Sequence, residues 1–193
     1  WEQIQRRDGQ YLGGGTGSNT GTGTRAVILG GVGSSYSNLT DRIDFFNIQT
    51  QGNAADFGNL TAAHYSMGVV CDGTRVIAAG GRTPSFSQDI DFFTISSLGD
   101  AADSGSDLLG TYNPAGLSDS TRGVFAITSG PAYRNDIDFI TIQSIGTAVD
   151  FGDLTDARGY GSALASNIRG CFLGGLDTGS PADLDINIID FVT

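Results

Sequence analysis

The chain has 193 residues, 21 of them acidic and 10 basic, and its formal net charge is −11. That length is enough to bury one core, and the negative charge excludes a nucleic-acid-binding surface, which needs basic patches. Every basic residue is arginine, so a Walker A phosphate loop and Schiff-base chemistry, which both need lysine, are excluded as well. No apolar run approaches the roughly 20 residues of a membrane-spanning helix, so we expect no membrane partner.

The first 24 residues are rich in glycine. Within them, residues 1–7 are candidates for a strand that closes the fold against its C-terminal end. Residues 9–22 would then form the first strand of the first repeat.

Four copies of one repeat follow, and together with the first segment they make a single domain over residues 1–193. The copies are residues 25–74, 75–121, 122–168 and 169–193. Each begins at an arginine (Arg25, Arg75, Arg122 and Arg169) and has an aspartate in a second apolar run (Asp44, Asp91, Asp138 and Asp185). The aspartates are 47 residues apart at every step, a period typical of stacked or ring-shaped repeat folds.

Each copy is predicted to form four short strands. In the second copy we place them near residues 65–71, 75–81, 89–95 and 101–108, and name them a, b, c and d. Strands b and c are apolar on both faces, as in a sheet that is covered on both sides. The sequence therefore predicts an all-β fold, a β-propeller of about four four-stranded blades.

Two repeated contacts are expected between blades. Phe45, Phe92 and Phe139 should lie in the apolar layers between neighbouring blades. The four arginines should make one common contact, either with repeated acids such as Asp56 or with turn carbonyls, because a guanidinium suits a fixed multidentate contact.

The strand that ends in Gly30-Gly31, Gly80-Gly81 and Gly174-Gly175 resembles the kelch repeat, although the aromatic pair of that repeat is not kept. The phrase Gly52-Asn53-Ala54-Ala55-Asp56-Phe57-Gly58 is similar to tandem repeats in proteins of tailed phages of marine bacteria. This resemblance covers residues 24–190 and implies a virion protein. Two arrangements stay open: a closed four-bladed ring, and a fragment or part of a larger ring.

Catalytic and metal-binding patterns are scarce. His64 is the single histidine, so we expect no metal, no cofactor and no Ser-His-Asp catalysis. The pairs Asp89/Asp91 and Asp136/Asp138 recur once per copy, which favours a structural role over a catalytic one. Cys71 and Cys171 fall at different repeat positions and are expected to be free thiols.

Length varies between copies only in the b–c connections, since the distance from each aspartate to the next arginine is 31 residues. The b–c and d–a connections emerge on the same face of a blade and contain aromatic residues and arginines. Loops on a rigid scaffold are common binding sites. The predicted binding residues are Tyr36, Arg82, Phe86, Tyr133, Arg134 and Tyr160.

We expect a non-enzymatic phage virion protein, a tail-fibre or tip module that adheres to a host glycan or another envelope component. A structural virion module that binds other virion proteins is the alternative, and a glycan-cleaving enzyme is a remote one. Within a particle, the protein is expected to form a homo-oligomer.

Overall fold

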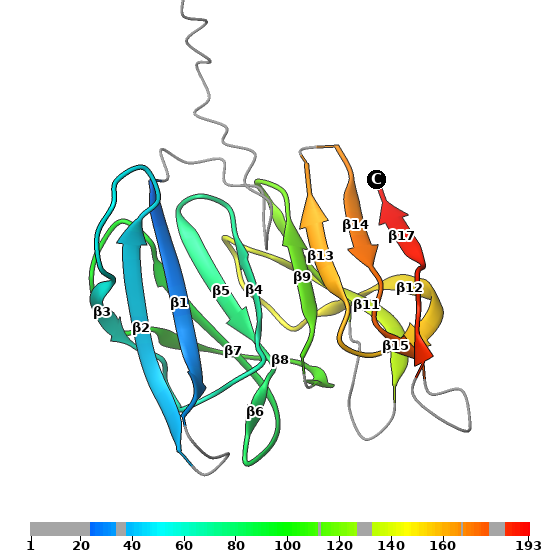
Figure 1. Cartoon of the computed structure of the whole chain (residues 1–193), viewed down its shortest axis with the longest axis horizontal. Coiled ribbons are helices and arrows are strands. Elements are labelled where there is room, and N and C mark those ends of the chain that lie inside the picture. The colour runs from blue at the N-terminus through cyan, green and yellow to red at the C-terminus, as the bar shows by residue number, and fades with distance from the viewer. Residues whose placement is uncertain (1–23, 34–37, 112, 127–132, 167, 178–183) are drawn as a thin grey trace, which may run out of the picture.

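The computed structural model describes all residues except 1–23, 34–37, 112, 127–132, 167 and 178–183. The described residues form strands and turns without a helix, so none of their segments is a helix that could cross a membrane. The strands are grouped into four antiparallel sheet units in chain order (Figure 1).

Unit 1 contains β1 (Arg25–Val32), β2 (Leu39–Asn47) and β3 (Ala55–Asn59). Unit 2 contains β4 (Gly68–Cys71), β5 (Arg75–Ala79), β7 (Ser85–Thr94) and β8 (Ala102–Thr111), with the short β6 (Arg82–Thr83) paired to β7. Unit 3 contains β9 (Ala115–Ser118), β10 (Arg122–Ala126), β11 (Arg134–Thr141) and β12 (Val149–Arg158). Unit 4 contains β13 (Ser162–Ala165), β14 (Gly170–Leu173) and β17 (Ile189–Val192), beside a small hairpin of β15 (Leu176–Asp177) and β16 (Leu184–Asp185).

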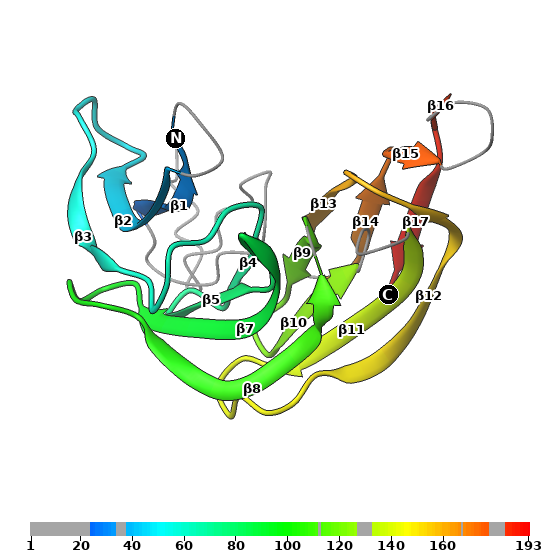
Figure 2. The same ribbon diagram turned by 90° about the horizontal axis from the view of Figure 1, so that it is seen from below.

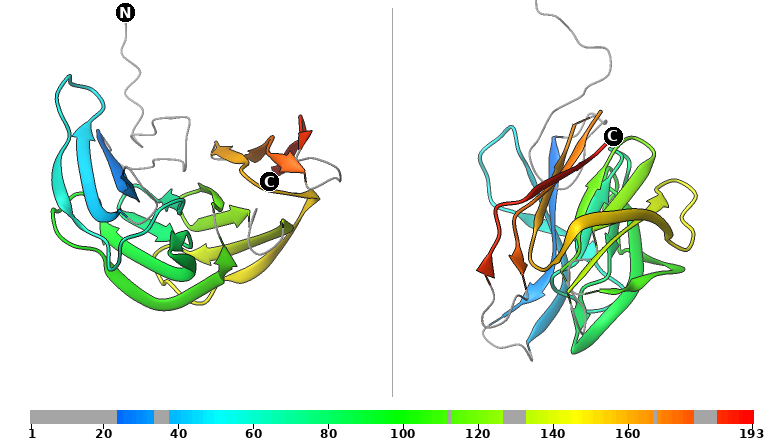
Figure 3. Two further views of the ribbon diagram at one scale, coloured as in Figure 1. Left: turned by 60° about the horizontal axis from the view of Figure 1, so that its bottom comes forward. Right: turned by 90° about the vertical axis from the view of Figure 1, so that its right-hand side faces the viewer.

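The units lie side by side along an arc (Figures 2 and 3). The first strands β4, β9 and β13 follow its concave side, and β3, β8 and β12 follow its convex side. This arrangement confirms the all-β prediction and is consistent with a propeller-like fold. The four-strand prediction holds for units 2 and 3, whereas three strands are described in units 1 and 4.

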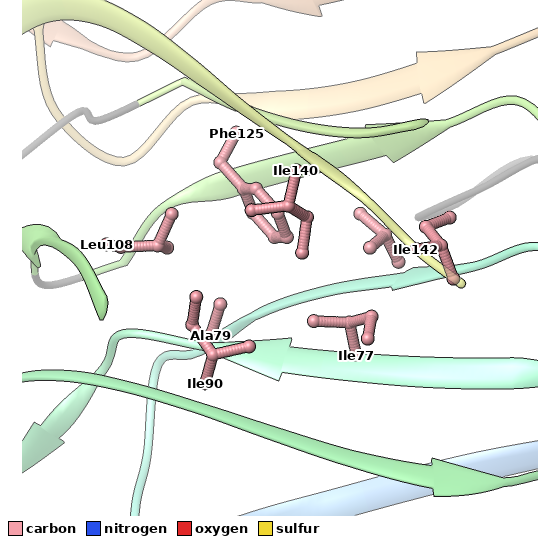
Figure 4. Close-up of a cluster of buried hydrophobic side chains, with 8 residues drawn as sticks. Ile77, Ala79, Ile90, Leu108, Phe125, Ile140 and Ile142 are labelled. Atoms are coloured by element: carbon pink, nitrogen blue, oxygen red, sulfur yellow. The ribbon is translucent and has the colours of Figure 1, made fainter. Parts of the chain in front are cut away.

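Buried apolar clusters fill each junction between neighbouring units. The central cluster, between units 2 and 3, contains Ile77, Ile90, Phe125 and Ile140, all at most 2% exposed (Figure 4). Similar clusters join unit 1 to unit 2 and unit 3 to unit 4. Strands β5 and β10 contribute to clusters on both of their faces, which explains why their sequences are apolar without alternation.

The predicted Phe45, Phe92 and Phe139 each pack against one of these clusters. Their position between units is therefore confirmed. No cluster joins unit 4 to unit 1 among the residues that the structure describes, and the proposed closing strand at residues 1–7 lies outside them.

The glycine pairs that follow strand b are required for two reasons. Their φ angles are positive, and the backbone of a d–a connection passes close to them. Gly81 has φ 93°, and a Cβ there would lie 2.8 Å from the carbonyl oxygen of Tyr65. Gly175 has φ 117°, and its Cβ would lie 2.5 Å from the carbonyl oxygen of Gly159. A larger residue at either site would push the d–a connection away from the sheet.

The predicted equivalence of Asp185 to Asp44, Asp91 and Asp138 is wrong. Asp190 takes that position, because it pairs with Phe172 as Asp138 pairs with Phe125. Asp185 lies in β16 and pairs with Leu176. The b–c connection of the fourth unit is longer and folds into the β15–β16 hairpin, so the distance from Asp138 to the equivalent aspartate is 52 residues instead of 47.

Candidate functional site

The described parts of the b–c and d–a connections lie at one end of the arc, which we call the loop end; β6 and β15 mark it in the lower part of Figure 1. Tyr133 and Tyr160 meet there edge to face, with ring centres 6.3 Å apart. Tyr160 is 48% exposed and has φ 58°, a strained angle for a large side chain. Beneath the pair, a Cβ on Gly159 would lie 2.7 Å from Tyr133 Cε1, so the ring packs directly on the backbone.

Arg134 stands next to this tyrosine pair and is held by Asp136, with Nε 2.6 Å from Oδ2. This hydrogen bond raises the pKa of Arg134 and lowers the pKa of Asp136. Both side chains remain about one-third exposed, so the contact fixes the guanidinium in place while leaving part of it open to a ligand.

Arg82 and Phe86 form a second group on the β6–β7 hairpin of unit 2. The guanidinium lies 5.6 Å from the centre of the Phe86 ring, and its Nε donates to the carbonyl oxygen of Pro84 at 3.1 Å. The predicted binding residues thus form two groups, while Tyr36 lies outside the described residues.

The four repeat arginines share one pose. Arg25, Arg75, Arg122 and Arg169 lie 4.7–5.1 Å from the ring centres of Phe45, Phe92, Phe139 and Phe191. Arg25 also donates to the Ile95 carbonyl at 2.6 Å, and Arg75 donates to the Ile142 carbonyl at 3.1 Å, in each case across to the next unit. The expected turn carbonyls are thus partners of two arginines, whereas the stacking on phenylalanine was not foreseen.

Threonines connect neighbouring units to the repeat aspartates. Thr61 donates from its backbone N and its hydroxyl to the two carboxylate oxygens of Asp91, at 3.0 and 2.6 Å. Thr155 makes the same two bonds to Asp190, at 3.3 and 2.8 Å. Because both oxygens of the buried Asp91 already accept these bonds, its role is structural.

The burial of two polar residues was not predicted, because the d–a connections were expected to be exposed loops. His64 and Arg158 occupy equivalent positions two repeats apart and are 2% and 1% exposed. His64 Nε2 lies 3.5 Å from Asp89 Oδ2. Arg158 Nη1 lies 2.8 Å from Asp190 Oδ2, an ion pair between units 3 and 4. The two positions are 94 residues apart, which is two repeat periods, but this spacing does not indicate burial.

Burial raises the pKa of Asp190, but the hydrogen bonds from Thr155 and the charge of Arg158 outweigh it and hold the pKa below its ordinary value. A depressed pKa adds stability above the unfolded value of about 3.9, and that stability is lost as the pH falls through the folded pKa. We therefore expect the free energy of unfolding of the wild-type protein to decrease as the pH is lowered below about 4. In urea titrations at several pH values, the free energy of unfolding of the Asp190→Asn variant should depend less on pH than that of the wild-type protein. An equal pH dependence in the two proteins would contradict the stabilising role of the Asp190 carboxylate.

A pocket of about 230 Å³ opens between units 3 and 4, away from the loop end. Its lining includes Arg122, Arg169 and Thr193. In the junction of units 2 and 3, the carbonyl of Gln143 accepts from Arg75 at 2.7 Å and its side chain bonds to Asp72.

The part of the chain that the structure describes has no group of three or more histidine, cysteine, aspartate or glutamate residues that could hold a metal ion. Both cysteines are free thiols, and burial raises the pKa of Cys71 to about 11, so this thiol stays protonated near neutral pH.

Comparisons with known proteins support the fold alone. No family model matches the chain, and no curated protein matches it. Among solved structures, one described as "Structure of YjhT" superposes with a TM-score of 0.63 at 13% identity, over 80% of this chain and 57% of that one. The chain therefore spans little more than half of that structure, and the likeness supports a propeller-like all-β fold.

Proposed function

We propose that the four units are blades of a kelch-like β-propeller, and that the protein is a virion component of a tailed phage that adheres to the host surface through its loop end. The repeat, the glycine pairs and the arc of stacked sheets support the propeller. The similarity of the repeat sequence to phage repeats supports the virion role.

The observation that carries the adhesive function is the pair Tyr133 and Tyr160, with Arg134 beside it. Tyrosine offers a large, rigid contact area at low entropic cost, and its hydroxyl can form hydrogen bonds. A half-exposed ring such as Tyr160 can stack on the apolar face of a sugar, while the held guanidinium donates to its hydroxyls or carboxylate. A host glycan suits this chemistry better than an anionic membrane, which the net charge of −11 would repel.

A structural virion module that binds other virion proteins is the second candidate. Aromatic residues and arginine, which the loop end presents, are also enriched at protein interfaces. Glycan cleavage has less support, because it requires two free carboxylates flanking the bond and Asp91 is engaged by Thr61.

Alanine substitution of Tyr160 should weaken adhesion to host cells by about 1–2 kcal/mol, a five- to thirty-fold higher Kd. Arg82→Ala should have a similar effect if both loop-end groups contact the ligand. Binding of the labelled chain to host cells, with released envelope glycan as competitor, measures both.

Leu98→Ala is the matched control, since Leu98 is 60% exposed in a turn away from the loop end. Unchanged binding by both loop-end variants would overturn the adhesive proposal. If the chain binds purified virion proteins and not host cells, the structural candidate replaces it.

A further inference from the structure

We propose that Tyr160, Arg134 and Asp136 bind a neutral sugar through its apolar face and two adjacent hydroxyl groups, and that this site selects against acidic sugars. The proposal rests on the adhesive function proposed above, and it names the class of glycan that the loop end takes.

Tyr160 occupies a position where the backbone disfavours a large side chain. The equivalent residues in the two earlier d–a connections are Ser66 and Asn113, and all three have φ between 57° and 59°. Asparagine is common in this left-handed region, whereas a bulky residue there is strained. Strained residues cluster at binding and active sites. Since a small residue serves at the other two positions, the backbone does not require the tyrosine, and we assign it to ligand contact.

The tyrosine of this connection is also placed differently from that of the first one. There, the preceding position is Tyr65, which is buried. In unit 3 that position is Gly159, and the tyrosine follows one residue later, where it is 48% exposed. The glycine leaves room for Tyr133, because a Cβ at residue 159 would lie 2.7 Å from Cε1 of that ring. Tyr133 then supports the exposed ring edge to face, and a sugar can stack on a ring held in this way.

Arg134 and Asp136 place hydrogen-bond donors beside an acceptor. Arg134 Nε donates to Asp136 Oδ2 at 2.6 Å, and both side chains are about one-third exposed. The guanidinium has further N–H groups on Nη1 and Nη2, and a carboxylate can accept several hydrogen bonds. Of two adjacent sugar hydroxyls, one can accept from Arg134 while the other donates to Asp136. Neither contact requires a charge on the ligand.

Carboxylates outnumber the open guanidinium at this site. A hydrogen bond to Asp136, together with the charges of Asp136 and Asp138, raises the pKa of Arg134. Asp153 lies directly opposite Asp136 in the β11–β12 strand pair, where opposed side chains are close neighbours. The arginine opposite Arg134 is Arg158, which is already in the buried ion pair between units 3 and 4. An acidic sugar would therefore meet net repulsion, whereas a neutral one would not.

Binding of the full chain to released envelope glycan, separated by anion exchange into a neutral and an acidic fraction, tests the charge of the ligand. We expect binding to the neutral fraction. Its Kd should change less than about twofold between roughly 0.05 and 0.5 M NaCl, because no attraction between charges is screened. A preference for the acidic fraction, weakened at least about tenfold by the same salt, would overturn the proposal.

Asp136→Asn has opposite effects on the two classes of ligand. It removes the carboxylate that holds Arg134 and accepts from a hydroxyl, so the Kd for the neutral fraction should rise about five- to tenfold. An acidic ligand would bind more tightly instead, because a repelling charge is lost. Asp153→Asn is the matched control: it removes a charge directly opposite, keeps the Arg134–Asp136 pair, and should change the Kd less than about twofold. Tighter binding by either variant would contradict a neutral ligand.

Tyr160→Asn introduces the residue that unit 2 carries at this position. The Kd for the neutral fraction should rise at least about fivefold. The midpoint of urea unfolding should stay the same or rise, because asparagine tolerates the left-handed backbone. Unchanged binding, or a clearly lower midpoint, would show that the tyrosine serves the fold and would overturn its assignment to the ligand.

Failure of the neutral-sugar proposal and failure of the adhesive function give different results. If the chain binds host cells and only the acidic fraction competes, the ligand is an acidic glycan, and adhesion stands while the neutral-sugar proposal falls. If the chain binds neither host cells nor either fraction, both are overturned.

Discussion

Replacing Phe125 with alanine is expected to lower the free energy of unfolding by about 3–5 kcal/mol. The ring is 0% exposed at the centre of the cluster between units 2 and 3. The backbone around it is already close-packed, since a Cβ on Gly68 would lie 2.9 Å from the Phe125 ring. The neighbouring strands can therefore collapse little into the space that the ring leaves, and urea denaturation measures the loss.

Leu98→Ala is again the control and should cost less than about 0.5 kcal/mol, as exposed substitutions usually do. A loss below about 1 kcal/mol for Phe125→Ala would contradict the role of the central junction in holding the units together.

The second large effect is expected at the buried ion pair between Arg158 and Asp190. Arg158→Met should destabilise the fold by about 3–5 kcal/mol, because it leaves the largely buried carboxylate of Asp190 without its cation. Thermal or urea unfolding near neutral pH, where Asp190 is ionised, measures this change.

The double variant Arg158→Met with Asp190→Asn removes both charges and should recover a large part of the loss. Additive losses in the double variant would show that the two residues act independently, and would exclude the ion pair as the cause.

Much of the scaffold could be predicted because its strands are short apolar runs that recur in each repeat. The arginine at the start of β5 and the run Ile90-Asp91-Phe92 mark two strands by sequence alone. Observed strands β5 and β7 fall within five residues of the predicted ranges. The burial of both faces of these strands could be predicted because apolar and polar residues do not alternate along them.

The fourth unit was misassigned because a constant period was assumed. The run Ile189-Asp190-Phe191-Val192 matches the earlier Ile-Asp-Phe runs better than Leu184-Asp185 does. The shift arises in the b–c connection, the one segment whose length already differed between units. An insertion there changes a loop without disturbing the pairing of the strands on either side.

The buried Arg158 and His64 could not be placed from the sequence, because polar residues in a connection usually lie at the surface. Their burial depends on the glycine pairs, which let the connection cross close to the next unit. The two loop-end groups were recognised as exposed aromatic and arginine residues. Their pairing, however, results from the path of the d–a connection, which brings Tyr160 to Tyr133.

Amide hydrogen exchange of the native chain measures most directly whether burial between units holds this scaffold rigid beneath its loop end. The amides of β5 and β10, covered on both faces, should exchange only through global unfolding, with rates that follow the urea-derived stability. The amides of β6 and of residues 84–86 at the loop end should exchange through local opening at least about a hundredfold faster. Exchange in β5 and β10 as fast as at the loop end, and insensitive to Phe125→Ala, would contradict a scaffold held together by its inter-unit clusters.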